Sequence, residues 1–183
     1  IYNTAVGTSA GRLVTTGIQN TLIGGLAGDA ITTASSLVAV GYGALGSNTT
    51  GAGNVAVGTN ALLDSTTGGN NTAVGTNSLS NNITGADNTV MGFEGMKAST
   101  TGADNTSVGY QSLYDNSTGS FNASFGHRAL FNNTTASNNT AVGTSTLFAN
   151  TTGASNIAVG INALSSNTTA SNNTAVGAAA LAA

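Results

Sequence analysis

Few residues in this sequence could carry out catalysis. The single histidine, His127, is the only candidate general base for a Ser-His-Asp triad, with Ser124 and Asp115 nearby in sequence. The chain has no cysteine, which excludes a disulfide framework and a thiolate metal site. Glycine-rich segments such as residues 41–46 lack the Lys-Ser/Thr of a phosphate-binding loop. We therefore expect no catalytic residue, no cofactor and no enzymatic activity.

Ring-bearing side chains form two series in which successive members are 17 residues apart. The first series is Phe93, Tyr110 and His127, and the second is Tyr114, Phe131 and Phe148. Surrounded by Asn and Thr, such rings could fill an interface with a neighbouring chain, form an exposed patch that binds glycan or protein, or have no role. The two series are the candidate functional residues of the chain.

Asp87 and Asp104 have the same spacing of 17 residues. If residues at this spacing are stacked neighbours, the two carboxylates lie roughly 5 Å apart. Together with Asn88 and Asn105 they could then ligate Ca²⁺, although two solvated turn residues are the simpler interpretation. We expect no metal site.

The spacing belongs to a repeat that covers the whole chain. Glycine occurs at eleven sites separated by 17 residues each time, from Gly7 to Gly177. With Asn3 as repeat position 1, the consensus is N-T-A-V-G-T-N-A-L-x-x-N-T-T-G-A-x. Residues 1–183 are thus a single array of eleven units, slightly divergent over residues 1–36 and cut within a unit at both ends. We expect it to be a window from a longer array.

A 17-residue unit suits one coil of a parallel β-solenoid, or β-roll, in an all-β fold. We expect strands at about positions 2–4 and 7–10, with turns that tolerate positive φ at position 5 and positions 13–15. Stacking at the strand spacing of roughly 4.8 Å gives a rod about 50 Å long. Asparagine at position 1 should hydrogen-bond from coil to coil. The threonine hydroxyl at position 14 should hydrogen-bond to backbone groups of the turn or to the threonines of adjacent coils.

The composition agrees with stacked coils and excludes several classes of function. Only three residues are Lys or Arg and six are Asp or Glu, which is too little positive charge for a nucleic-acid platform. Like charges directly above one another repel, which explains why charge is scarce. The sequence contains no apolar run of about 18 residues, the length that a membrane-spanning helix needs.

One aliphatic residue at position 4, one leucine at position 9 and a few alanines make a thin core for each coil. Packing several chains side by side would bury a second face of every coil. Small residues at positions 3 and 8 would permit their close approach. We therefore expect a homotrimer rather than a monomer.

The consensus unit N-T-A-V-G-T-N-A-L, which residues 71–79 (N-T-A-V-G-T-N-S-L) and residues 139–147 (N-T-A-V-G-T-S-T-L) follow closely, resembles the YadA-like head repeats of trimeric autotransporter adhesins. With N-N-T-T-G between copies, it also resembles the repeat arrays of bacteriophage tail fibres. The resemblance implies a left-handed parallel β-roll, three chains around a threefold axis, and an extracellular location on a bacterial cell or a virion. The period differs, since the adhesin repeats are about 14 residues long and the repeat of this chain is 17 residues long.

These observations predict a structural or adhesive segment of an extracellular trimeric fibre, acting as a rigid spacer that could contact host-surface glycan or protein. The alternative is an ice-binding solenoid, because threonine at position 14 forms a ten-rung ladder. That alternative needs a second threonine column on the same face, and adjacent residues of an extended strand point to opposite sides.

Overall fold

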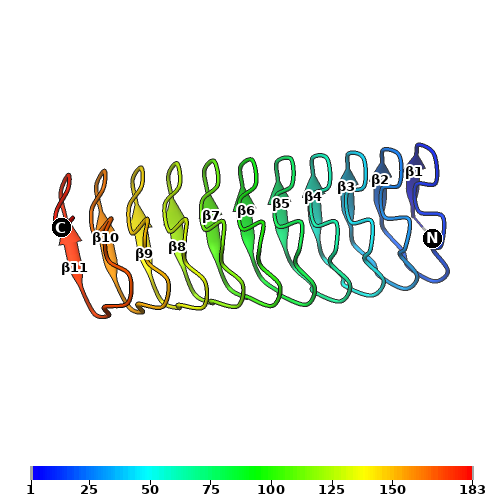
Figure 1. Cartoon of the computed structure of the whole chain (residues 1–183). Helices are drawn as coiled ribbons and strands as arrows, with labels where there is room; N and C mark the ends of the chain where they lie inside the picture. The colour runs from blue at the N-terminus through cyan, green and yellow to red at the C-terminus, as the bar shows by residue number, and fades with distance from the viewer. Residues whose placement is uncertain (1, 183) are drawn as a thin grey trace.

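The computed structural model describes residues 2–182, so the two ends of the predicted array, Ile1 and Ala183, lie outside the described residues. It is an all-β rod of stacked coils, each contributing one short strand to a parallel sheet (Figure 1). The strands are β1 (Thr4–Val6), β2 (Thr21–Ile23), β3 (Val38–Val40), β4 (Val55–Val57), β5 (Thr72–Val74), β6 (Thr89–Met91), β7 (Thr106–Val108), β8 (Ala123–Phe125), β9 (Thr140–Val142), β10 (Ile157–Val159) and β11 (Thr174–Val176).

The sheet order is the sequence order, and each strand pairs with the next at a register of one repeat, as in Thr72↔Thr89 and Val74↔Met91. We number the coils after their strands, so that coil 6 contains β6. The predicted parallel β-solenoid is confirmed. Within residues 2–182 there is no helix long and apolar enough to cross a membrane.

The second strand predicted for positions 7–10 is wrong, because that segment forms turns in every coil. Positions 7 and 9 both adopt left-handed backbone, as in Glu94 (φ 53°) and Met96 (φ 46°). Two left-handed residues at alternate positions fold the chain back on itself and prevent an extended strand. The glycine at position 5 has positive φ as predicted, between 128° and 144°. In the second turn, positive φ occurs at position 17, as in Asp87 (φ 58°), instead of at position 15.

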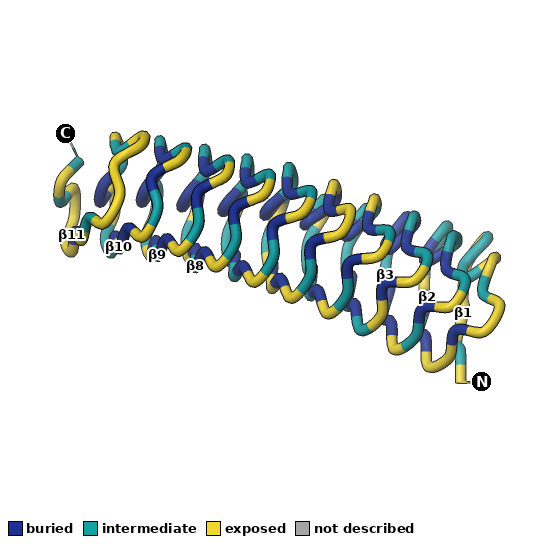
Figure 2. The backbone as a smooth tube through the Cα atoms, turned by 90° about the horizontal axis from the view of Figure 1, so that it is seen from below, coloured by how far each residue is buried: buried dark blue, intermediate teal, exposed yellow. Residues whose placement is uncertain are grey.

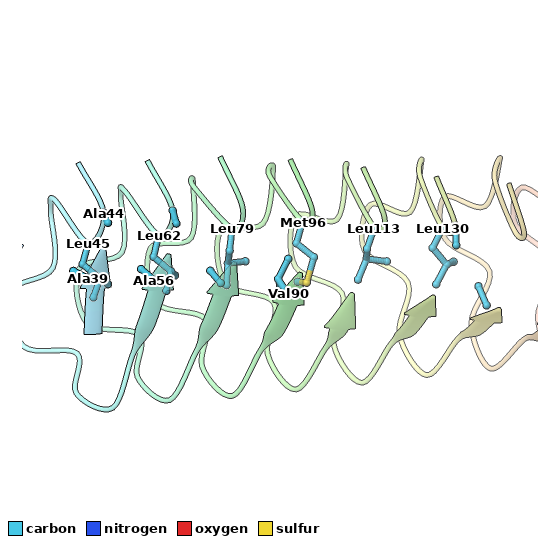
Figure 3. Close-up of a cluster of buried hydrophobic side chains, with 14 of the residues drawn as sticks. Ala39, Ala44, Leu45, Ala56, Leu62, Leu79, Val90, Met96, Leu113 and Leu130 are labelled. Atoms are coloured by element: carbon cyan, nitrogen blue, oxygen red, sulfur yellow. The ribbon is translucent and has the colours of Figure 1, made fainter. Parts of the chain in front are cut away.

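The interior of the rod is filled by the leucine column at position 9 and by small residues at positions 3 and 8 (Figure 3). In coil 4, Ala56, Ala61 and Leu62 are all fully buried. The expectation that small residues face neighbouring chains is therefore wrong. Opposite walls of so thin a coil meet in the middle, and alanine is what fits beside leucine.

The aliphatic column at position 4 points outward instead of contributing to the core. Successive residues of a strand point to opposite faces, so burial of position 3 places positions 2 and 4 on the outer face. Strand β6 shows this, since Val90 is buried whereas Thr89 and Met91 are exposed. The burial pattern recurs from coil to coil, and Figure 2 shows buried and exposed segments aligned along the rod.

Asparagine at position 1 forms the predicted coil-to-coil ladder inside the rod. The Oδ1 of Asn71 accepts the backbone N–H of Asn88 at 3.0 Å, and its Nδ2 donates to the Gly85 carbonyl at 2.9 Å. The Oδ1 contact to the next coil recurs in nine of the ten successive coil pairs, and Leu37 replaces asparagine at the exception. Each amide thus supplies one acceptor and one donor that satisfy buried backbone groups.

A second asparagine ladder lies at position 12, which the sequence alone did not single out. Asn133 donates from Nδ2 to Asn116 Oδ1 at 2.9 Å, and Asn150 donates to Asn133 Oδ1 at 3.0 Å. These asparagines occur in N-x-S/T triplets, yet Asn133 and Asn150 are fully buried. The hydrogen bonds of the ladder account for asparagine at this position.

Threonine at position 13, and not the predicted position 14, bonds the coils at the second turn. Thr49 Oγ1 donates to the Thr66 carbonyl at 3.1 Å, and Thr134 Oγ1 does the same to Thr151. The position-14 threonines are all exposed, and their hydroxyls make no hydrogen bond within residues 2–182. The position-14 ladder therefore presents its hydroxyls to solvent.

The position-12 ladder has two gaps, and they account for two buried acceptors that lack a partner. Oδ1 of Asn48 and of Asn82 are unpaired, and the following coil has Ser65 and Ser99 at this position instead of asparagine. A serine hydroxyl is too short to reach an oxygen one coil away. Each gap leaves two buried polar atoms unpaired, the asparagine Oδ1 and the serine Oγ, and both cost stability.

We predict that Ser65→Asn raises the free energy of unfolding by about 1 kcal/mol, because its amide would donate to Asn48 Oδ1 and restore the ladder. Urea denaturation measures the change. Ser65→Ala is the matched control, since it removes the unpaired hydroxyl without adding a donor. An Asn variant no more stable than the Ala variant would contradict the ladder as the source of the gain.

Candidate functional site

The two predicted aromatic series form two continuous stacks on the surface of the rod. In the position-6 stack, ring centroids are 5.5 Å apart for Phe93 and Tyr110 and 5.1 Å apart for Tyr110 and His127. In the position-10 stack, the distances are 5.1 Å for Tyr114 and Phe131 and 5.3 Å for Phe131 and Phe148. The position-6 rings are exposed and the position-10 rings are half-buried. The register of the coils alone sets this arrangement, because each ring lies beside the ring one repeat away.

The stacks present ring edges, and not ring faces, along most of their length. Interplanar angles between 4° and 12° show that neighbouring rings cover one another's faces. Both faces of Tyr110 are covered, so an approaching sugar cannot stack on it. Only the ends of a column, such as the side of His127 toward coil 9, have an aromatic face that no second ring covers.

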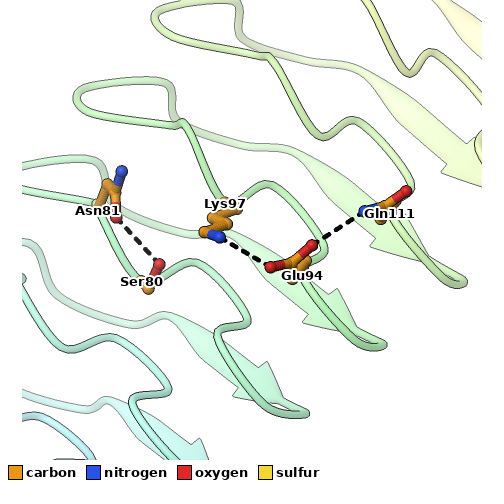
Figure 4. A network of polar contacts seen from close by, with 5 residues as sticks. All are labelled: Ser80, Asn81, Glu94, Lys97 and Gln111. Carbon is orange, nitrogen blue, oxygen red and sulfur yellow. Dashed lines mark hydrogen bonds and ion pairs between the residues drawn. The ribbon is translucent and has the colours of Figure 1, made fainter.

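A polar ladder at position 7 lies beside the position-6 stack, within the segment where the chain carries most of its charge. Gln111 Nε2 donates to Glu94 Oε2 at 2.9 Å, and Arg128 Nε donates to Gln111 Oε1 at 3.0 Å. Lys97 Nζ donates to Glu94 Oε1 at 2.7 Å, as Figure 4 shows together with the Gln111 contact. Acid, amide and base thus follow one another in one column, which avoids like charges in adjacent coils.

Arg128 of this ladder and Lys97, which pairs with Glu94, each lie over a position-10 ring. Lys97 Nζ is 5.9 Å from the centroid of Tyr114, and Arg128 Cζ is 5.3 Å from that of Phe131. We call the two stacks together with Glu94, Lys97, Gln111 and Arg128 the coil 6–9 patch. The sequence contained a signal for the polar ladder, because Glu94, Gln111 and Arg128 recur at the 17-residue spacing.

Hydrogen bonding fixes the charge state of the ladder. The hydrogen bond from Lys97, followed by that from Gln111, lowers the pKa of Glu94. The same bond to Glu94 raises the pKa of Lys97. Elsewhere on the patch, burial raises the pKa of Asp115, which is half-buried beside Tyr114. Glu94 and Lys97 are therefore both charged around neutral pH.

The structure does not bring the residues of the candidate triad together. Ser124 is buried inside coil 8, where its Oγ accepts from Ser112 Oγ at 2.7 Å and donates to the Ala129 carbonyl at 2.9 Å. His127 lies outside the coil, stacked on Tyr110. Strand alternation places the serine inside the wall and the histidine outside it.

The two aspartates considered for a cation lie on the outside of the second turn. Asp87 accepts from Asn70 Nδ2 at 3.2 Å, and both Asp87 and Asp104 are exposed. Asn88 and Asn105 point inward and belong to the buried position-1 ladder, so they do not join the carboxylates as ligands. Over residues 2–182, no group of three or more His, Cys, Asp or Glu side chains is placed to hold a metal ion.

Comparison of the chain with protein-family models, with curated proteins and with solved structures gives no match.

We predict that Glu94→Gln lowers the free energy of unfolding by about 0.5–1 kcal/mol at neutral pH, the value for a partly exposed ion pair. A lowered carboxylate pKa contributes stability above the ordinary pKa of 4.5, and this contribution is lost as the pH falls through the folded-state value. The difference between wild type and variant should therefore disappear in acid. Denaturation at several pH values measures it, with Asp64→Asn, an exposed carboxylate outside the patch, as control. A difference that persists in acid would show that the charge of Glu94 is not its cause.

Proposed function

We propose that this chain is a structural segment of an extracellular homotrimeric fibre, similar to a trimeric autotransporter adhesin head or a bacteriophage tail fibre, that acts as a rigid spacer. The observation that supports this most is the outer face of the β-sheet, where an uncharged apolar column runs the length of the rod. Val6, Met91 and Phe125 of this column are 58%, 47% and 41% exposed. Resemblance of the repeat unit to these fibres supports the same proposal.

The exposed face is as large as the largest apolar patches of monomeric proteins, which often mark interaction sites. Positions 2 and 4 of every strand point outward, so two columns of Thr, Val, Ile, Met, Phe and Ala run side by side over a rod about 50 Å long. With a width of about 10 Å, the face covers roughly 500 Å², which is at the upper end for a monomeric protein. Burying it in an oligomer gives each coil a second apolar contact in addition to its thin interior.

Copies of the same chain are the partner that this face fits. Its two columns contain no Asp, Glu, Lys or Arg, so parallel copies bring no like charges together. A repeat of constant length gives each copy the same flat surface from end to end. Three copies around an axis would be stiffer than one rod and would display every surface site three times, which adds avidity to weak contacts.

We predict that the chain forms a species of about three times its 17.6 kDa mass, measured by size-exclusion chromatography with light scattering. The double variant Val57→Lys, Val74→Lys places positive charges in adjacent coils of the sheet face and should dissociate the assembly.

The matched control is Thr67→Lys, Thr84→Lys, which adds the same charges at exposed position 14 and should leave the mass unchanged. A wild-type chain that is folded and monomeric would contradict the proposal, and a mass of two chains would contradict its threefold symmetry.

Ice binding is the second candidate, because the ten position-14 threonines, Thr16 to Thr169, are all exposed and form a regular hydroxyl column. The neighbouring position-13 hydroxyls do not extend this column, since Thr49 and Thr66 donate theirs to carbonyls of the next coil. A single column is narrow for ordering a layer of water.

We therefore predict no thermal hysteresis at millimolar protein, measured by nanolitre osmometry. If hysteresis is observed and the triple variant Thr67→Val, Thr84→Val, Thr101→Val abolishes it, ice binding is assigned to position 14 instead. The same substitutions should not alter the oligomeric mass, because position 14 lies in the second turn, away from the sheet face.

A further inference from the structure

The geometry points to a binding site for a carboxylate-bearing sugar at the junction of coils 8 and 9, where Arg128 binds the carboxylate and the sugar ring packs on the side of His127 that no second ring covers. This site goes beyond the proposed spacer function and does not depend on the trimer. It uses the coil-9 end of the coil 6–9 patch, where a cation without an acidic partner lies next to an imidazole face that no ring covers.

Arg128 is held in place before any ligand arrives. Its Nε donates to Gln111 at 3.0 Å, its Cζ lies 5.3 Å from the centroid of Phe131, and Gln111 is itself held by Glu94 at 2.9 Å. Folding has therefore already removed most of the side-chain entropy of Arg128. Ordering this side chain adds little to the cost of binding a ligand.

Arg128 is also the cation without an acidic partner within residues 2–182. Arg12 pairs with Asp29 at 3.5 Å and Lys97 pairs with Glu94 at 2.7 Å. Only Nε of Arg128 is engaged, and its two terminal nitrogens make no hydrogen bond to the described residues. The guanidinium thus retains donors in the planar fork that matches a carboxylate.

The columns change from long to short side chains immediately after these two residues. Tyr110 covers one face of His127, with the rings 5.1 Å apart and 9° from parallel. On the opposite side, position 6 continues with Thr144, and position 7 continues after Arg128 with Ser145. The imidazole side toward coil 9 therefore faces the short Thr144 side chain instead of a ring, and it borders, together with the guanidinium, two hydroxyl side chains that can bond sugar hydroxyls. A pyranose has an apolar C–H face for the ring and polar groups at its edge.

Charge favours a sugar unit with one carboxylate over a polyanion. One unpaired cation matches one carboxylate per binding unit. A polyanion such as an acidic peptide would in addition meet a chain of net charge −3, with Glu94 and Asp115 on the same patch. The ligand class is therefore a hexuronate or another monocarboxylated pyranose.

The single histidine of the chain makes the test direct, because its ring protons give one assignable pair of NMR signals. The full chain in its native assembly is titrated with methyl β-D-glucuronide at constant pH and ionic strength. Methyl β-D-glucoside is the neutral counterpart, and tetraglutamate is the competing source of carboxylate. We expect a saturable shift of the His127 signals with the glucuronide, and binding at least about tenfold weaker with the glucoside.

Arg128→Gln should weaken glucuronide binding at least about tenfold, and Arg128→Lys should weaken it less, because lysine keeps the charge but not the fork. The control is Arg12→Gln, an arginine elsewhere on the rod that is paired with Asp29 and should not matter. Circular dichroism and the oligomeric mass are measured on every variant, which separates loss of the site from loss of the assembly.

Equal responses to glucuronide and glucoside, full binding by Arg128→Gln, or preference for tetraglutamate would each overturn the proposal. If Arg128→Gln fails to fold, the glucuronide-to-glucoside comparison on wild type and the Arg128→Lys variant still decide it.

Discussion

Each residue of this rod lies directly beside its own copy one repeat away, and the rest of the structure depends on that register. Backbone bonds between coils require every coil to have the same length, so a single insertion would displace all later ladders. Each side chain must therefore pack or bond with the side chain at the same position of the next coil. Asparagine does so best at positions 1 and 12, because one amide both donates and accepts, as Asn71 and Asn133 show. Aliphatic and aromatic residues do so by packing. Most charged residues have an opposite charge or no charge at the same position of the next coil, and the exposed pair Asp87 and Asp104 is the exception.

The same register explains where the charged residues are. Arg12 lies beside Asp29 in adjacent coils, and Glu94, Gln111 and Arg128 form an alternating column that ends without an acidic partner. Apart from the exposed Asp87 and Asp104, no charged residue has a like charge at the same position of the next coil, so a cation left over at the end of a column is informative. Arg128 is such a cation, and it coincides with the end of an aromatic stack.

The thin interior has a consequence for assembly. Because alanine and leucine fill the coil, the larger aliphatic residues at position 4 lie on the outer face of the sheet, where a single chain buries them only in part. Val57 and Val74, half-buried in the single chain, would be covered further by a neighbouring copy in the proposed assembly. The small residues at positions 3 and 8, which would suit close chain packing by their size, are used inside the coil instead.

The sequence by itself determined the period, the parallel stacking of copies, the asparagine ladder at position 1 and the grouping of the six rings into two columns. These follow from spacing alone, since a constant repeat fixes which residues are neighbours. It did not determine which way each column faces. The left-handed backbone of residues such as Glu94 and Met96 replaces the expected second strand with turns, and the burial of position 3 turns position 4 outward. Those outcomes depend on the width of the closed coil, which decides what fits inside. Only the tertiary structure could therefore separate Ser124 from His127, bury Asn88 away from Asp87, and show that stacked rings offer their edges.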